Sequence, residues 1–175
     1  MRLDDVHREM LTLLRADGRL SMSALAEQVG ISRANAYARL EAMQAAGVVR
    51  GFTVDVDPTL VGRPIAVLVF VSLQQNRWAE FREQLRELPH LEYFAVTTGQ
   101  YDGMLLLRAA GVAEVHQLVV SVIADWPSVR STETVFLMDE EHFTYDMRPS
   151  PAGPAPDDTL GMTRFVSTPD RRRAP

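Results

Sequence analysis

The order of apolar patterns between residues 65 and 138 constrains the fold more than any other feature of the chain. Residues 65–73 form a nearly unbroken run of apolar, largely β-branched residues, which is typical of a buried strand. Five further elements are predicted: a helix over residues 76–88, strands over 91–98 and 101–109, a helix over 112–124 and a strand over 129–138. This β-α-β-β-α-β order predicts a ferredoxin-like αβ-sandwich with both helices on one face of an antiparallel sheet. Because nothing in the sequence remains to cover the other face, we expect a homodimer.

Residues 1–52 show helical spacing instead, and three short helices are predicted there. Each helix has a polar cap and a glycine stop, which are Asp4 and Gly18, Ser21 and Gly30, and Ser32 and Gly47. Gly18 is expected to end its helix in a left-handed conformation. The tight turn over residues 30–32 predicts a helix-turn-helix, and residues 48–52 are predicted to form a strand. The complete chain is therefore predicted to be α+β, with a winged-type helix-turn-helix domain followed by the αβ-sandwich.

The outer face of the third predicted helix has the residue types that contact DNA. Its side chains are Ser32, Arg33, Asn35, Tyr37 and Arg39, and residues 28–40 include no acidic residue that would repel phosphates. Arg33 and Asn35 suit base edges, since arginine pairs with guanine and asparagine with adenine. Ser32, Tyr37 and Arg39 are expected to contact phosphates. The pattern alone also fits a three-helix bundle with a solvated polar face.

Charge and composition narrow the possible functions. The net charge is −5, but residues 1–50 have seven arginines and six acidic residues, so the negative charge lies mainly further along the chain. The absence of cysteine excludes disulfides and cysteine-ligated zinc and fits a cytoplasmic protein. No apolar stretch is long enough to cross a bilayer. The four histidines match no metal-binding pattern, so we expect no metal, no cofactor and no catalytic site.

Short motifs across both halves resemble those of the Lrp/AsnC family, the leucine-responsive or feast/famine transcriptional regulators. The resemblance runs from about Leu3 to about Phe143. The matching segments are residues 3–11, 18–21, 29–32, 47–53 and 57–58 in the first half, and residues 97–102, 126–129 and 132–134 in the second. The turn at residues 99–102 is similar to a Gly-x-[Tyr/Phe]-Asp motif of the family.

The resemblance implies a regulator that binds double-stranded DNA and a small effector, typically an amino acid, and that assembles as a dimer, tetramer or octamer. The implied effector residues are Thr98, Gly99, Tyr101, Asp102, Thr132 and Thr134. Gly99 would let backbone amides approach an effector carboxylate, and Asp102 would pair with an ammonium group. The same motif is also what a tight hairpin turn stabilised by Asp102 would need.

The predicted organisation has four parts. They are a DNA-binding domain over residues 1–52, a linker strand over 53–64, an effector-binding and oligomerisation domain over 65–147, and a disordered proline-rich tail over 148–175. Two other functions are compatible with a chain of this composition. An enzyme would need a convergent set of catalytic groups, which the sequence lacks. An architectural chromosome protein that binds DNA without an effector would look much the same in sequence.

Overall fold

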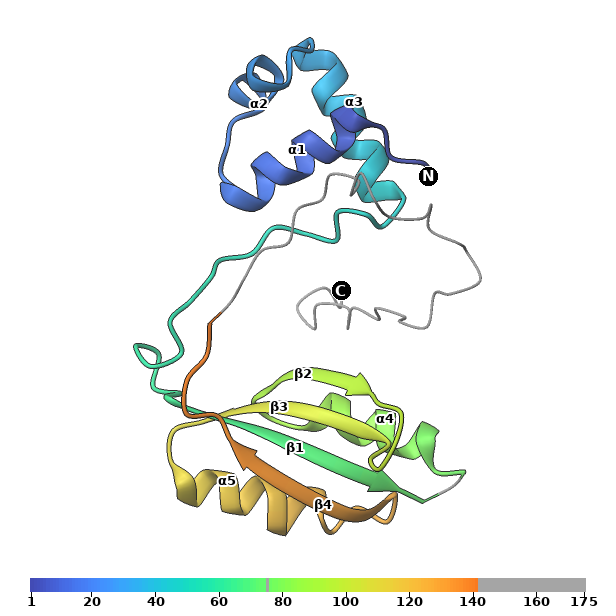
Figure 1. The fold of residues 1–175 in the computed structure, drawn as a ribbon, viewed down its shortest axis with the longest axis vertical. Helices are drawn as coiled ribbons and strands as arrows, with labels where there is room; N and C mark the ends of the chain where they lie inside the picture. The colour runs from blue at the N-terminus through green and yellow to red at the C-terminus, as the bar shows by residue number, and fades with distance from the viewer. Residues whose placement is uncertain (75, 142–175) are drawn as a thin grey trace, which may run out of the picture. The chain divides into compact units, whose positions relative to one another are not determined.

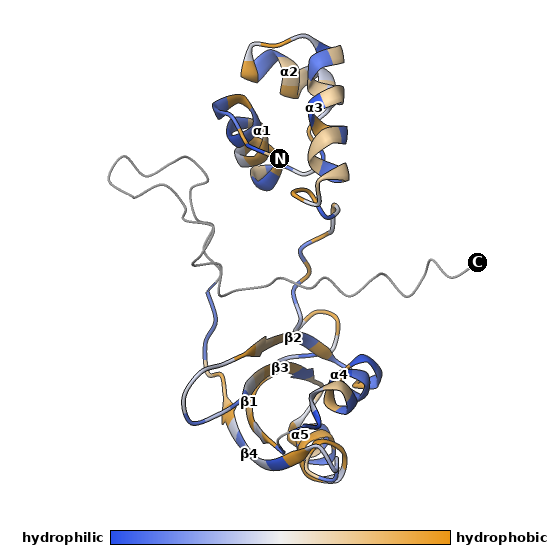
Figure 2. Cartoon of the chain, turned by 90° about the vertical axis from the view of Figure 1, so that its right-hand side faces the viewer, coloured by the Kyte–Doolittle hydropathy of each residue, from blue (hydrophilic) through white to orange (hydrophobic). Residues whose placement is uncertain are grey.

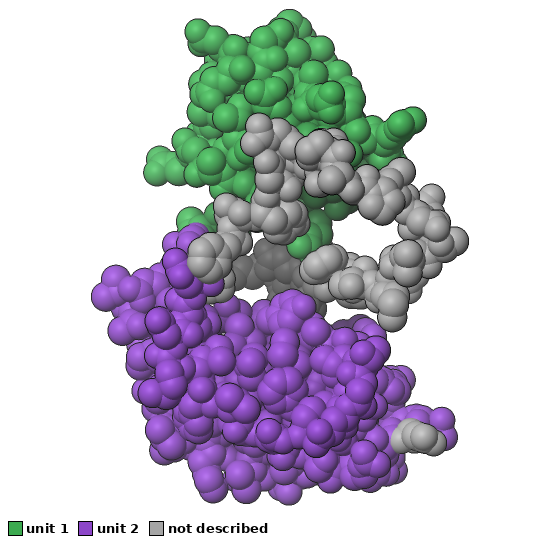
Figure 3. Space-filling model, in the orientation of Figure 1, with its two compact units in different colours: residues 1–54, 143–175 green, residues 55–142 purple. Residues whose placement is uncertain are grey.

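The computed structural model describes residues 1–74 and 76–141. The chain divides between Val54 and Asp55 into two compact units, coloured separately in Figure 3. Each unit is described by itself. The boundary falls within the predicted linker over residues 53–64. The proline-rich tail over residues 148–175 lies outside the described residues.

The described part of unit 1 contains three helices, α1 (Asp5–Ala16), α2 (Met22–Val29) and α3 (Arg33–Ala45) (Figure 1). The three predicted N-caps are confirmed, because the side chains of Asp4, Ser21 and Ser32 each accept a hydrogen bond from a backbone N–H in the first turn that follows. Gly30 ends α2 with a φ of +74°, as predicted. The helix-turn-helix between α2 and α3 is therefore confirmed.

The helices of unit 1 enclose a small apolar core. Met10, Leu25, Ala36 and Met43 are fully buried, and Leu40 packs against them. Ala36 and Met43 lie seven residues apart on one side of α3, so this side faces the core. The opposite side of α3 is left exposed to solvent.

Three details of residues 1–64 were predicted wrongly. Gly18 does not adopt a left-handed conformation; α1 ends one residue earlier, at Asp17, whose carboxylate accepts a hydrogen bond from the backbone N–H of Arg19 at 2.8 Å. Residues 48–52 form no strand, and neither does the linker over residues 53–64. The backbone N–H groups of Val48 and Val49 donate to Met43 at the end of α3. A strand needs a neighbour that shares backbone hydrogen bonds with it, and within the described part of the chain the backbone hydrogen bonds of residues 48–64 are all to residues nearby in the sequence.

Unit 2 has the predicted β-α-β-β-α-β order. Its elements are β1 (Ile65–Leu73), α4 (Trp78–Glu87), β2 (Leu91–Val96), β3 (Gly103–Ala109), α5 (Val112–Leu118), a five-residue π-helix η1 (Val119–Ile123) that continues α5, and β4 (Val129–Phe136). The sheet has the strand order β2-β3-β1-β4 with every neighbouring pair antiparallel. Helices α4 and α5 lie on one side of it (Figures 1 and 2). The ferredoxin-like fold is therefore confirmed.

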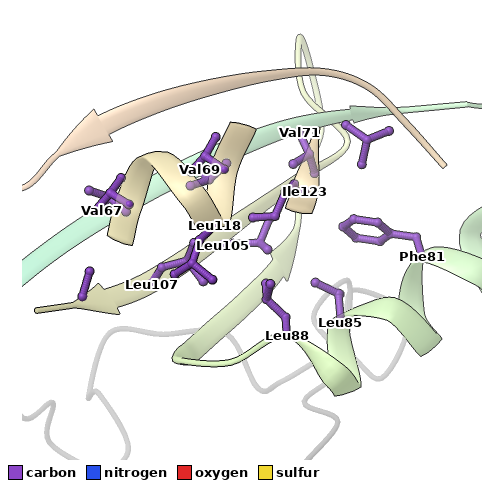
Figure 4. Packing of buried hydrophobic residues seen from close by; sticks show 14 of the residues in the cluster. Val67, Val69, Val71, Phe81, Leu85, Leu88, Leu105, Leu107, Leu118 and Ile123 are labelled. Atoms are coloured by element: carbon purple, nitrogen blue, oxygen red, sulfur yellow. The ribbon is translucent and has the colours of Figure 1, made fainter. Parts of the chain in front are cut away.

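The core of unit 2 lies between this sheet and its helices. Val67, Val69 and Val71 of β1 are fully buried and face the helices, as Figure 4 shows. Phe81 of α4 is at the centre, and its ring meets those of Trp78, Phe94 and Trp126 with centroids 5.7–6.2 Å apart.

Three helix details differ from the sequence prediction. Helix α4 begins at Trp78 rather than at residue 76, because Asn76 has a φ of +75°. Helix α5 runs only to Leu118 before the π-helical turn. Val112, expected on the inner side of α5, is 60% exposed because it lies in the first turn, where the helix begins beyond the edge of the core.

The second face of the sheet is not covered by either of the described helices of unit 2. Direct cross-strand partners share a face, and the pairs Leu68–Leu106 and Phe70–Met104 alternate with the buried valine pairs. These four side chains therefore lie on the uncovered face, and each is only partly buried. We call this surface, formed by Leu68, Phe70, Met104 and Leu106, the open sheet face. None of the described helices is both long and apolar enough to cross a membrane.

Candidate functional site

The N-terminal part of α3 has an exposed cation held by an aromatic ring. The guanidinium carbon of Arg33 lies 5.5 Å from the ring centroid of Tyr37, one helical turn later, and a guanidinium nitrogen lies 3.5 Å from the Tyr37 hydroxyl. Both side chains are exposed. Ser32 caps the helix by accepting a hydrogen bond from the backbone N–H of Asn35 at 3.2 Å. The exposed end of α3 therefore has an arginine that is partly ordered before any ligand arrives.

Arg39 lies on the same helix but in a different environment. A terminal guanidinium nitrogen of Arg39 lies 2.8 and 2.9 Å from the two carboxylate oxygens of Asp4, and the Arg39 side chain is only 22% exposed. Its Nε–H donates to the side-chain oxygen of Asn35 at 3.1 Å. The sequence predicted a phosphate contact for Arg39, whereas the structure pairs its charge with a carboxylate inside unit 1. This ion pair joins α3 to the first turn of α1.

Asp4 is held in the ionised form by its neighbours. The backbone N–H of His7 donates to the Asp4 carboxylate at 2.9 Å, and with Arg39 this lowers the pKa of Asp4 to about 2. The His7 ring lies 2.7 Å from the same carboxylate and is itself buried. The cap of α1 and the middle of α3 are therefore tied together by a fully charged pair at any pH above the acid range.

In unit 2, the residues of the predicted effector turn connect β2 to β3. The carboxylate of Asp102 accepts a hydrogen bond from the backbone N–H of Leu73 at 2.7 Å, while its own N–H donates to Val71 at 2.9 Å. The hydroxyl of Thr97 donates to the carbonyl of Tyr101 at 2.6 Å. Asp102 thus anchors the turn to the end of β1, which is the hairpin role that the sequence left open.

The tip of this turn is accessible. Thr98 and Gly99 are exposed, and Gly99 has a φ of +106° with nothing within 4 Å of the position that a Cβ would occupy. A side chain at this position would be strained, so glycine is required here for the backbone conformation. The tip is therefore open on the side of Gly99 where a Cβ would project.

Tyr101 extends over the open sheet face. Its hydroxyl donates to the carboxylate of Glu133, which raises the pKa of Tyr101, and its ring lies 5.3 Å from that of Phe70. The side-chain amide of Gln100 donates to the same hydroxyl at 3.2 Å. Tyr101, Glu133 and Phe70 therefore form one cluster of polar and aromatic groups beside the turn.

Two of the predicted effector residues lie on the other face. Thr132 pairs with Val71 and Thr134 with Val69, and both valines are fully buried on the helix-covered face. The threonines therefore point away from Tyr101. Sequence reasoning selected these hydroxyls and missed Glu133 between them. The alternation of a strand was the available signal, because residue 133 must face opposite to its two neighbours.

Ion pairs also fix the segment that enters β1. Arg63 donates to both oxygens of Glu114 in α5 at 2.7 and 2.9 Å, and His90 lies 3.2 Å from the same carboxylate. The backbone N–H of Ala110 and the Arg63 guanidinium lower the pKa of Glu114. On the open sheet face, Arg108 is paired with Glu92 and Glu140.

Each of the two units matches a known protein family. Residues 3–50 match the winged helix-turn-helix DNA-binding family, and residues 66–145 match the Lrp/AsnC ligand binding domain. The transcriptional regulator AldR of Mycolicibacterium smegmatis is 32% identical over 140 residues, which cover 78% of this chain and 82% of that protein. The leucine-responsive regulatory protein of Haemophilus influenzae is 26% identical over 141 residues, covering 79% and 85%.

Solved structures agree with the fold. AsnC of Escherichia coli superposes with a TM-score of 0.77 at 21% identity, covering 85% of this chain and all of that one. A transcriptional regulator of Neisseria meningitidis, crystallised in complex with L-Met, superposes with a TM-score of 0.76 at 23% identity, covering 83% and 96%. The two matched domains, in this order and over most of the chain, show that the protein is a DNA-binding transcriptional regulator of the Lrp/AsnC family.

Proposed function

We propose that the protein reads specific DNA sequences through the exposed N-terminal end of α3 and that a small effector, an amino acid, modulates this binding from the second domain. The observation that carries the proposal is the position of Arg33. It is exposed at the start of the second helix of a helix-turn-helix, is ordered by Tyr37, and lies in a stretch without acidic residues. This is the part of such a motif that enters the major groove.

The proposal includes a dimer, because most operators of helix-turn-helix dimers are two-fold symmetric. Two apolar surfaces of the single chain favour it. The first is the open sheet face, which no described segment of unit 2 covers. The second is the segment following α3, where Phe52, Val54 and Val56 alternate along the chain and are 51%, 78% and 48% exposed. A two-fold partner that supplied the missing strand neighbour would bury these side chains and place two copies of α3 about 34 Å apart.

The effector part of the proposal rests on the turn at residues 98–102. An exposed glycine in a left-handed conformation lets backbone N–H groups approach a carboxylate closely, and the adjacent Tyr101 hydroxyl and Glu133 carboxylate offer polar contacts to an ammonium group. The complex of the related Neisseria meningitidis regulator with L-Met favours an amino acid. Thr132 and Thr134 are left out of the proposed site, and Asp102 acts through the shape of the turn. A cytoplasmic location follows from this function.

A thermal-shift screen with each proteinogenic amino acid tests the effector. An effector at a hundred times its dissociation constant should stabilise the protein by about 2.7 kcal/mol, which is a clear increase in melting temperature. Gly99→Val is the test variant, because the branched side chain is strained at this φ and covers the amides, and Gly111→Ser is the control. Stabilisation that persists in Gly99→Val would exclude the turn. No stabilisation by any amino acid, together with DNA binding, would favour an architectural DNA-binding protein.

Selection from a pool of random duplexes tests the DNA part. The full chain should enrich a sequence with two-fold symmetry, and Arg33→Ala should lose discrimination at one base pair of each half-site. An equal loss of affinity on every sequence would instead make Arg33 a phosphate contact.

A further inference from the structure

The side-chain amide of Asn35 is held in one orientation. The Nε–H of Arg39 lies 3.1 Å from the amide oxygen of Asn35, and an arginine nitrogen can only donate. The oxygen of the amide must therefore face Arg39. The NH₂ group then points away from Arg39, and Asn35 is exposed in the first turn of α3, two residues after Arg33.

Arg39 is itself held in place by Asp4, the N-cap of α1. One terminal guanidinium nitrogen contacts both oxygens of Asp4, and the planar guanidinium passes this constraint to its Nε. Asp4 is in turn held as the N-cap of α1 by the backbone N–H of His7. A continuous chain of hydrogen bonds thus runs from the start of α1 through Arg39 to Asn35.

This arrangement changes what Asn35 can recognise. Adenine is read by an amide that donates to N7 and accepts from the N6 amino group, whereas guanine offers two acceptors, N7 and O6. We propose that Asp4 and Arg39 are positioning residues that make Asn35 a hydrogen-bond donor to guanine rather than a partner of adenine. The inference rests on the proposed reading of DNA by α3 and adds the base preference of one residue within it.

The charges of the pair make the arrangement persistent. The lowered pKa of Asp4 keeps its carboxylate ionised well below neutral pH, so the acceptor that holds Arg39 is charged. The Arg39 side chain is only 22% exposed, so packing also limits its movement. The preference of Asn35 is therefore a property of the folded domain before DNA binds.

Selection of binding sites by the full chain and its variants tests the inference. In Asn35→Ala, the position of the selected sequence that loses its base preference identifies the base pair that Asn35 contacts. The wild type should select guanine there, and Arg39→Leu, which frees the amide to turn, should shift the preference toward adenine on the order of tenfold. Arg19→Leu removes one exposed arginine of the same domain and should leave the preference at this position unchanged.

The results distinguish the positioning role of Asp4 and Arg39 from the proposed function. Three results would overturn the positioning role. The wild type could select adenine at this position, Arg39→Leu could still select guanine there, or Asn35→Ala could leave the preference at every position unchanged. Enrichment of no sequence by the wild type would instead contradict the proposed function. If Arg39→Leu fails to fold, Asp4→Asn keeps an oxygen for the helix cap and loosens Arg39, and the same shift, reduced in size, is expected from it.

Discussion

The carboxylate of Asp102 accepts a hydrogen bond from the backbone N–H of Leu73, 2.7 Å away, and so closes the turn between β2 and β3 onto the end of β1. Leu73 is only 5% exposed, so its N–H has little access to water as an alternative partner. Two parts of the turn therefore have different roles. Asp102 holds its shape, while the exposed tip at Gly99 is left for a ligand.

Asp102→Ala should destabilise unit 2, because the N–H of Leu73 would lose its partner while remaining buried. The expected loss is about 1–3 kcal/mol in the free energy of unfolding, measured by chemical denaturation. Asp102→Asn keeps a neutral oxygen acceptor and should lose less. Asp125→Ala, which removes an exposed carboxylate of the same unit, is the control. Equal stability of Asp102→Ala and the wild type would show that the bond contributes nothing.

Gly103→Ala should also destabilise unit 2. An added Cβ would lie 2.8 Å from the ring of Phe94 and 3.3 Å from a methyl group of Val71, and Phe94 cannot retreat because its ring packs on Phe81. Overpacking of this kind costs about 1–3 kcal/mol. Gly111→Ser, where nothing lies within 4 Å of the added Cβ, should change the melting temperature far less.

Glu133→Gln should lower the pKa of Tyr101 toward its usual value. The carboxylate accepts a hydrogen bond from the phenol and repels the phenolate, so the pair stabilises the fold at neutral pH, and this stabilisation is lost as the pH rises through the raised pKa of Tyr101. The ultraviolet absorbance of tyrosinate, taken as the difference between each protein and its Tyr101→Phe variant, measures this titration. A Tyr101 titration that is the same with and without Glu133 would contradict the contact.

Arg39→Leu should raise the pKa of Asp4 from about 2, without fully restoring the usual value, because the N–H of His7 lowers it too. Since the folded pKa is depressed, the stabilisation from Asp4 is complete above about pH 4 and is lost as the pH falls through about 2. The carboxyl carbon resonance of Asp4, followed by NMR titration, reports both values. An unchanged titration in Arg39→Leu would show that the ion pair does not persist in solution.

Helix caps, element order and the buried strand were predictable because each depends on residues close together in the sequence. Ser32 caps α3 through the backbone three residues on, and the apolar run of β1 is buried on the side of its helices whatever else the chain does. The strand over residues 48–52 was predicted from side-chain type alone. A strand also needs a neighbouring backbone, and that neighbour is not supplied by the described part of a single chain.

The candidate sites were predicted only in part, because pairing across the fold decides which groups meet. The link between Asp4 and Arg39 spans 35 residues, and no local pattern shows that an arginine of the reading helix is already paired. The register of β4 on β1 places Thr132 and Thr134 opposite buried valines and brings Glu133 to Tyr101 instead. Sequence spacing predicted the turn at Gly99, where the determinants are local.

The affinity of the full chain for its selected operator, compared with a scrambled duplex of equal length by fluorescence anisotropy at physiological salt, tests the central claim most directly. A reader of DNA sequence should bind the operator at least about 10³-fold more tightly than the scrambled duplex, and Arg33→Ala should reduce that ratio by about tenfold or more. Equal affinity of the wild type for both duplexes would contradict sequence-specific reading by α3.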